Sequence, residues 1–232
     1  MNRSTIQHFD PDPERLAIIR ECMEDYGVAD SDSEWTNNIF SKKAVVYGSG
    51  VIAKEGQIVR HNVAVDELAL CKRLAKEVCT LMQGVDVGMG SESSDPFGEF
   101  FIVANIDDPV PEIIDEALIK SKFNGIIFPS VTMTVEPLEE SGKWWSEVEA
   151  DGSGEEEYLS RWRAMIAWFH AQPEFIDRAF VRIGEYGAIK ELNQVSESLF
   201  MIETPGCVFP RMAIGLTKNG SLVGIFGFSV QT

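Results

Sequence analysis

The side chains that most often carry enzyme chemistry form no recognisable constellation in this chain. His8, His61 and His170 lie far apart, with no H-x-x-H spacing and no serine or cysteine nucleophile motif nearby. Carboxylates are plentiful, so a metal site built from Asp and Glu stays open, but no set of them has ligand spacing. We therefore expect a protein that is not an enzyme and that carries neither a metal nor a cofactor.

One stretch of the chain matches a nucleotide-binding motif. Residues 48–53 read Gly-Ser-Gly-Val-Ile-Ala and match the G-x-G-x-x-A pattern of dinucleotide-binding folds. In those folds the motif opens a helix, whereas residues 54–60 have the pattern of a turn and a short strand. The sequence favours a two-stranded meander with the strand at residues 44–47 over a cofactor site.

The strongest local pattern is a β-hairpin at residues 207–232. Apolar residues alternate on both sides of Asn219-Gly220, and this dipeptide predicts a type I′ turn because it tolerates positive φ at both central positions. The second arm runs to the end of the chain, so the carboxylate of Thr232 is expected at the tip of a strand. The alternative is a core hairpin whose end has no role.

Composition and charge restrict the classes of partner. The chain has 232 residues, 44% of them hydrophobic and 25% charged, with a formal charge of −17. This acidity argues against nucleic acid or an anionic membrane as partner and would attract a basic protein, although it also serves solubility. The cysteines are scattered without a C-x-x-C pair, and no apolar run reaches the roughly 18 residues of a membrane span, so we expect a cytoplasmic protein.

The first half of the chain alternates helical and strand patterns. Asp12-Pro13 predicts a helix start, and an apolar stripe predicts a surface helix over residues 65–82. A turn of short hydroxyl and acidic side chains at residues 91–98 then leads into an apolar strand at residues 99–104. Within this turn, Glu92 is the one long carboxylate.

The second half continues the alternation. Asp108-Pro109 predicts a helix that ends at Asn124-Gly125, and residues 126–128 and 131–135 read as strand. Residues 136–157 read as an acidic loop in which Trp144 and Trp145 form either a lid on the core or an exposed contact patch. A capping-box spacing predicts a helix after residue 153, a strand follows at residues 179–185, and residues 186–206 read as irregular. Together these elements predict a mixed sheet covered by helices on both faces.

Three separated stretches carry a family resemblance. They are Ser91-Glu92-Ser93-x-x-Pro96-Phe97, then Arg182-Ile183-Gly184-Glu185, and the terminal hairpin from Ile214-Gly215-x-Thr217 to Val230-x-Thr232. In order and spacing they resemble the cyanobacterial nuclease A inhibitor family. The resemblance covers roughly residues 64–232, which we expect to form one inhibitor-like domain, with residues 1–63 as an N-terminal extension of a helix plus a hairpin packed on it.

This resemblance implies both a fold and a function. The implied fold is a three-layer α/β/α sandwich with a mixed or antiparallel sheet, like that of the plant pathogenesis-related class 1 proteins. The implied function is inhibition of a basic, sugar-nonspecific, metal-dependent nuclease whose active site receives an acidic turn and the C-terminus. On this chain the resemblance assigns partner binding to these positions: Ser91, Glu92, Ser93, Asp95, Trp144, Trp145, Gln231 and Thr232.

Physical chemistry is compatible with that assignment. A nuclease site holds phosphate with Arg, Lys and a divalent metal, so a carboxylate on a stiff turn can occupy the phosphate position without offering a scissile bond. The chain departs from the family in its first 63 residues, at Asp95, where an aromatic residue is usual, and in the insertion at 186–206. The extension could cover the binding face or form a homodimer contact. The alternative function is therefore an acidic interaction module of the same fold with a non-nuclease partner.

Overall fold

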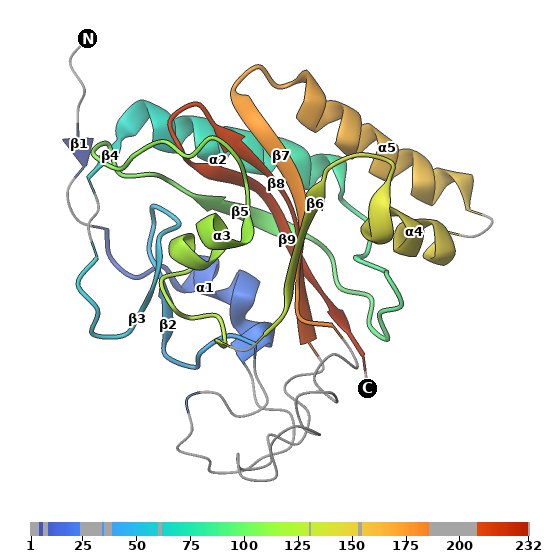
Figure 1. Ribbon diagram of the computed structural model, residues 1–232, viewed down its shortest axis with the longest axis horizontal. Coiled ribbons are helices and arrows are strands. Elements are labelled where there is room, and N and C mark those ends of the chain that lie inside the picture. Colours follow the sequence, from blue (N-terminus) through green and yellow to red (C-terminus); the bar gives the residue numbers. More distant parts are fainter. Residues whose placement is uncertain are drawn as a thin grey trace.

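We describe the architecture from a computed structural model of the chain (Figure 1). The described residues are 5–6, 9–23, 34, 39–59, 62–129, 131–152, 155–185 and 208–231. Helices make up 34% and strands 29% of the structure, which places the chain in the class of proteins that combine helices with an antiparallel sheet. None of the helices in these ranges combines the length and the apolar character that a membrane crossing requires.

A five-stranded sheet forms the centre of the structure. Its strands lie in the order β5-β9-β8-β7-β6, and each neighbouring pair is antiparallel. The sequence predicted a mixed or an antiparallel sheet, and the observed sheet is purely antiparallel. The strand bounds are Gly98–Ile102 (β5), Met133–Pro137 (β6), Phe175–Ile183 (β7), Val208–Thr217 (β8) and Leu222–Val230 (β9).

The hairpin of β8 and β9 is confirmed, but its turn differs from the expected type. The two strands pair in register from Val208↔Val230 to Leu216↔Leu222. Between them Gly220 has φ +85°, whereas Asn219 does not have positive φ, as a type I′ turn would need. The amide of Gly220 donates to the carbonyl of Thr217 at 2.9 Å. The connection is therefore a three-residue hairpin loop with glycine in the left-handed position. Asn219 is thereby relieved of strain, and its side chain donates to Glu67 Oε2 at 2.6 Å.

Three helices cover one face of the sheet. They are α2 (Val65–Leu81), α4 (Gly142–Asp151) and α5 (Glu156–Ala171). Because side chains alternate along a strand, Phe180, Ala213 and Ile225 point to this face and join its core. The predicted helix at residues 65–82 is confirmed, and its apolar stripe, including Cys71, Leu74 and Val78, is buried.

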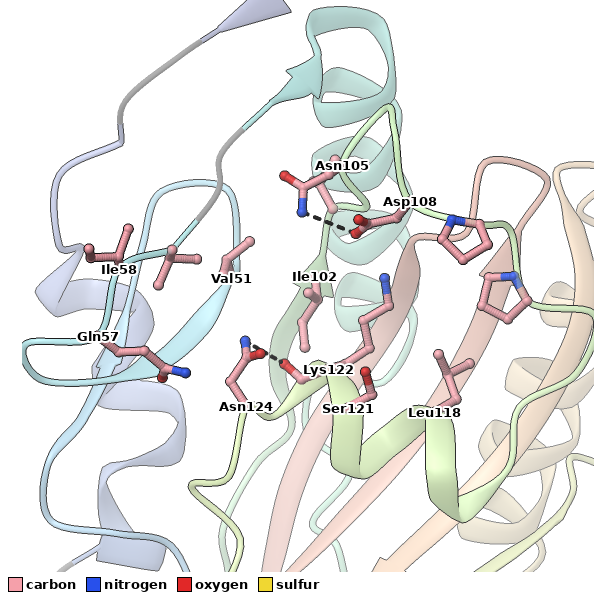
Figure 2. A pocket seen from close by; sticks show the side chains of 14 residues that line it. Val51, Gln57, Ile58, Ile102, Asn105, Asp108, Leu118, Ser121, Lys122 and Asn124 are labelled. Carbon is pink, nitrogen blue, oxygen red and sulfur yellow. Dashed lines mark hydrogen bonds between the residues drawn. The ribbon is translucent and has the colours of Figure 1, made fainter.

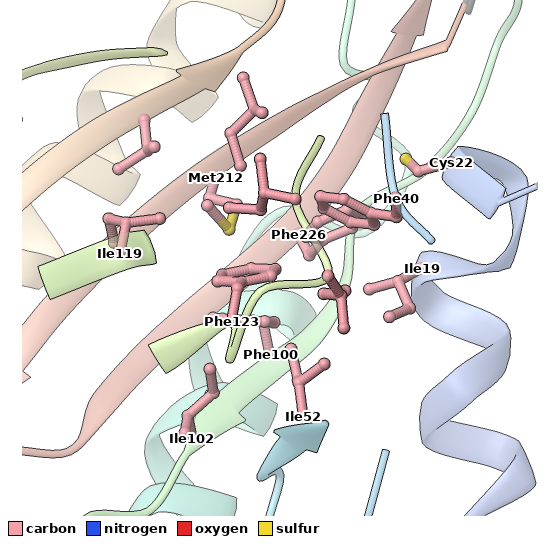
Figure 3. Close-up of a cluster of buried hydrophobic side chains, with 14 of the residues drawn as sticks. Ile19, Cys22, Phe40, Ile52, Phe100, Ile102, Ile119, Phe123, Met212 and Phe226 are labelled. Carbon is pink, nitrogen blue, oxygen red and sulfur yellow. The ribbon is translucent and has the colours of Figure 1, made fainter. Parts of the chain in front are cut away.

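The opposite face carries a second core (Figure 3). Helix α1 (Pro13–Ile19), the 3-10 helix η1 (Arg20–Met23) and helix α3 (Glu116–Lys122) supply Ile19, Cys22 and Ile119 to it, and Phe123, the C-cap residue of α3, joins them. Phe100 and Phe226 of the sheet pack in the same core, and the centroids of these two rings are 5.9 Å apart. Residues before position 64 thus share one core with the sheet.

The short strands lie in the N-terminal part of the chain. Strands β2 (Ala44–Val46) and β3 (Ile52–Lys54) form the expected antiparallel pair, and β1 (Thr5–Ile6) pairs with β4 (Val63–Ala64). The last position of the G-x-G-x-x-A motif, Ala53, therefore lies within a strand and opens no helix. This geometry is the meander, and it lacks the helix start that would face a pyrophosphate.

Several helix boundaries differ from expectation. Asp12 caps α1 as predicted, accepting bonds from the amides of Glu14 and Arg15. Helix α3, however, begins at Glu116 and not at Pro109, because Asp115 is its cap and accepts from the amide of Leu118 at 2.7 Å. Residues 142–151 were expected as loop and form α4. Ser153 of the proposed capping box lies outside the described residues, and the residue before α5 is Glu155.

Candidate functional site

The Ser-Glu-Ser turn lies directly beside the end of the last strand. The amide of Glu92 donates to the carbonyl of Val230 at 2.8 Å. The amide of Val230 donates in return to the hydroxyl of Ser91 at 2.9 Å. The side-chain amide of Gln231 donates to the carbonyl of Met89 at 3.4 Å. Two stretches that the sequence keeps far apart thus form one surface element.

Closure of the loop at residues 86–96 positions this turn. Its two ends meet through a bridge between Asp86 and Pro96, and the amide of Val87 donates to the carbonyl of Asp95 at 3.1 Å. Gly88, Met89 and Gly90 all have φ between +61° and +72°, which is rare for a residue such as Met89. Met89 is 3% exposed, so its buried side chain holds the loop in this conformation.

Helix α4 supports the loop from the side. Asp151, the last residue of this helix, accepts a hydrogen bond from the amide of Gly90 at 3.0 Å. A Cβ at Gly88 would lie 2.4 Å from both the Asp151 carboxylate and the Tyr158 hydroxyl. A side chain at Gly88 would therefore displace the side-chain ends of Asp151 and Tyr158.

Within the turn, the short side chains form hydrogen bonds with one another, whereas the Glu92 side chain is exposed to solvent. The Ser93 hydroxyl donates to the carboxylate of Asp95, and the amide of Ser93 donates to the Ser91 hydroxyl at 3.3 Å. Ser91, Ser93 and Asp95 are each half-buried, whereas Glu92 is exposed. The turn thus presents one long carboxylate, and its serines and Asp95 maintain its shape.

The surface around the turn is acidic. Asp86, Glu92 and Asp151 are exposed there, and Asp95 is half-buried. Burial, together with the negative charges of Asp151 and Asp86, raises the pKa of the neighbouring Tyr158 to about 12. The observed geometry suits contact with cationic groups of a partner.

Trp144 and Trp145 do not belong to this surface. Their exposed fractions are 0% and 4%, and the ring of Trp144 stacks on Phe180 with centroids 4.5 Å apart. The indole N–H of Trp144 donates to the carbonyl of Pro137 at 3.1 Å. The interpretation as an exposed contact patch is therefore wrong for the free protein, and the pair is a lid on the core, because α4 turns both rings toward the sheet.

Of the two C-terminal residues assigned to partner binding, one is described. Gln231 is half-buried beside the loop at residues 86–96, as its bond to Met89 requires. Thr232 lies outside the described residues. The structure thus brings Glu92 and the last described residue to the same end of the sheet, whereas both tryptophans are buried in the core.

The Arg182-Ile183-Gly184-Glu185 stretch has a structural role in this arrangement. Arg182 is 2% exposed and pairs with Glu136 and Glu147 at 2.9 Å each and with Glu185 at 3.3 Å. These pairs connect β6, β7 and α4. Gly184 has φ +75°, and a Cβ there would lie 2.8 Å from the Phe209 ring.

Sequence reasoning missed Asp151, which supports the turn from a distance of 61 residues in sequence. It stands among many acids in the 136–157 stretch, and no spacing relates it to Gly90.

His8 and His61 lie outside the described residues, and His170 contacts the carbonyl of Leu138 at 3.0 Å. Within the described ranges, no three His, Cys, Asp or Glu side chains gather in an arrangement that could hold a metal ion.

Comparisons with known proteins add no family assignment. No protein-family model matches the chain, and no curated protein matches it significantly.

Proposed function

We propose that this protein inhibits a basic, sugar-nonspecific, metal-dependent nuclease by inserting the Ser91–Ser93 turn and the C-terminal end of β9 into its active site. The observation that supports this proposal is the pair of hydrogen bonds between the turn and Val230. Through these bonds one carboxylate, that of Glu92, lies beside the C-terminal end of β9. A single concave site could therefore receive both.

The rest of the molecule is compatible with this role. The loop is fixed by Asp151 and by the buried Met89, so little conformational freedom would be lost on binding. The formal charge of −17 favours encounter with a basic enzyme. Neither catalysis by this chain nor a cofactor forms part of the proposal, and the proposed site of action is the cytoplasm.

The fold proposal follows the same resemblance. We propose a three-layer α/β/α sandwich similar to that of the plant pathogenesis-related class 1 proteins. Support comes from the position of the helices, with α2, α4 and α5 on one face of the sheet and α1 and α3 on the other (Figure 1). The 64–232 domain would form the sandwich, and residues 1–63 would extend one of its layers.

A nuclease assay tests the function directly. The purified protein is titrated into a basic, sugar-nonspecific, magnesium-dependent nuclease, and the cleavage of both single-stranded DNA and RNA is followed. The proposal predicts loss of both activities at a one-to-one ratio, because one plug blocks one site. The control is Glu139→Gln, which removes an exposed charge distant in sequence from the turn.

Binding measured in parallel separates the alternative. An acidic interaction module would bind a basic protein in a salt-sensitive manner and leave nuclease activity intact. Full nuclease activity at saturating protein, together with tight binding to the enzyme, would reject the plugging proposal in favour of that module.

A further inference from the structure

A second candidate site lies at the other end of the sheet. A cavity of about 410 Å³ is lined by residues that precede and follow β3, by the loop after β5 and by helix α3 (Figure 2). Ile102, which borders the cavity, pairs with Leu222, whereas Gly98, at the turn-side end of β5, pairs with Phe226. The cavity and the Ser91–Ser93 turn therefore lie toward opposite ends of β5, so ligand binding in the cavity is independent of the proposed nuclease inhibition.

The cavity combines apolar walls with one cation. Val51, Ile102 and Leu118 supply apolar surface from three different segments of the chain. The Lys122 side chain extends from α3 across the cavity toward Asp108 (Figure 2). Within the described part of the chain, its ammonium has no hydrogen bond or ion pair. Burial lowers the pKa of Lys122, and the charge of Asp108 acts in the opposite direction.

One carboxylate faces the same space. Asp108 lines the cavity and is held by Asn105, whose side-chain amide donates to Asp108 Oδ2 at 3.1 Å. The oxygen of that amide group in turn accepts from the amide of Asn62 at 3.0 Å, which fixes its orientation. The bond from Asn105 thus positions the carboxylate, and among the described residues its other oxygen, Oδ1, accepts no hydrogen bond.

Charge balance selects the ligand class. A simple anion would be attracted by Lys122 but repelled by Asp108. A simple cation would be attracted by Asp108 but repelled by Lys122. A small molecule that carries both charges satisfies both side chains, and an apolar side group would fill the space between the aliphatic walls. The volume lies within the range of small-molecule sites, in which a few polar groups orient a ligand against apolar walls.

We propose that this cavity binds a small zwitterion with an apolar side group, of the class of free aliphatic amino acids, with its carboxylate on Lys122 and its ammonium on Asp108. Both contacts are charge-assisted hydrogen bonds. The removal of either should lower the affinity by about ten- to a hundredfold.

Three probes with the same isobutyl group test the proposal on the wild-type protein. L-leucine carries both charges, 4-methylpentanoate lacks the amine, and 3-methylbutylamine lacks the carboxylate. Calorimetry or ligand-observed NMR should show binding of L-leucine and at least tenfold weaker binding of the other two. Equal affinity for L-leucine and either single-charge probe, or no binding of L-leucine at millimolar concentration, would overturn the proposal.

Variants locate the site. Lys122→Met and Asp108→Asn should each weaken L-leucine binding about tenfold or more. Lys120→Met is the matched control, because Lys120 lies on the same helix, is exposed and pairs with Glu116 on the surface. Unchanged affinity in Lys122→Met would contradict the assignment. If a variant melts early, the probe series on the wild-type protein still decides the question.

Discussion

The hydroxyl of Ser91 accepts a hydrogen bond from the amide of Val230 at 2.9 Å, across 139 residues of sequence. This contact, with the reciprocal bond from the Glu92 amide to the Val230 carbonyl, makes the loop at residues 86–96 an extension of the sheet edge. Any partner that contacts Glu92 therefore also approaches the end of β9.

Glu92→Gln should weaken nuclease inhibition far more than Glu139→Gln or Glu155→Gln. Loss of one member of a desolvated charge pair costs on the order of 2 to 5 kcal/mol, whereas charges at the rim mainly change the association rate. All three side chains are exposed in the free protein, so folding should be equally intact. Inhibition constants of the three variants provide the measurement, and equal effects would mean that only bulk acidity matters.

Residues appended after Thr232 should abolish inhibition and leave the fold intact. The bonds of Val230 and Gln231 hold the strand end against the loop, so added residues would collide with the walls of the narrow enzyme site. Protein tagged at the N-terminus is the control, with thermal melts of both forms. Full inhibition by the C-terminally tagged protein would contradict a role for the chain end, as expected for a hairpin whose end is idle.

Association with the nuclease should slow as salt rises. A formal charge of −17 acts on a basic partner over a Debye length of about 10 Å at 0.1 M ionic strength, and this length shortens at higher salt. Stopped-flow association rates at low and high ionic strength provide the test. A rate that does not change with salt would remove the steering argument.

Arg182→Met should destabilise the protein strongly. Arg182 is buried between β6, β7 and α4, and its removal leaves Glu136 and Glu147 without their shared cation. Breaking a buried ion pair costs about 3 to 5 kcal/mol. Arg163→Met is the control, because Arg163 pairs with Glu140 and Glu156 on the surface, where such pairs contribute about 0 to 1 kcal/mol. Urea denaturation should separate the two variants, and similar midpoints would contradict the structural role of Arg182.

Tyr158 should ionise later than an ordinary tyrosine, because burial raises its pKa from 10.0 to about 12. Between these values the unfolded chain has already lost the proton and the folded protein retains it. The stability from this group is therefore complete below pH 10 and falls as the pH rises toward 12. Absorbance titration at high pH, compared with Tyr158→Phe, should assign the late-titrating phenol to Tyr158. A difference curve centred near pH 10 would show that this phenol is not buried as described.

Local patterns predicted the elements whose signals are complete within a few residues. The stripe of Leu74 and Val78 predicts a helix with one buried face, and the period-two pattern on both sides of residues 219–220 predicts the terminal hairpin. The cap at Asp12 is equally local. In each case the backbone bonds or the buried face are specified by residues close in sequence.

Tertiary structure decided what these patterns left open. An apolar pair such as Trp144 and Trp145 has the same sequence pattern in a lid and in a contact patch, and only the packing of α4 on Phe180 distinguishes them. Likewise, Asn-Gly is compatible with two turn geometries, and the bond from Asn219 to Glu67 of α2 accompanies the one observed.

The candidate sites themselves depend on contacts distant in sequence. The sequence by itself determined that Glu92 lies in a turn and that a strand follows the hairpin loop at residues 219–220. Only the folded structure placed the two side by side and set Lys122 opposite Asp108. The physical reason is that the chain carries local conformational preferences at each position, whereas a surface forms from side chains that meet only after the sheet has assembled.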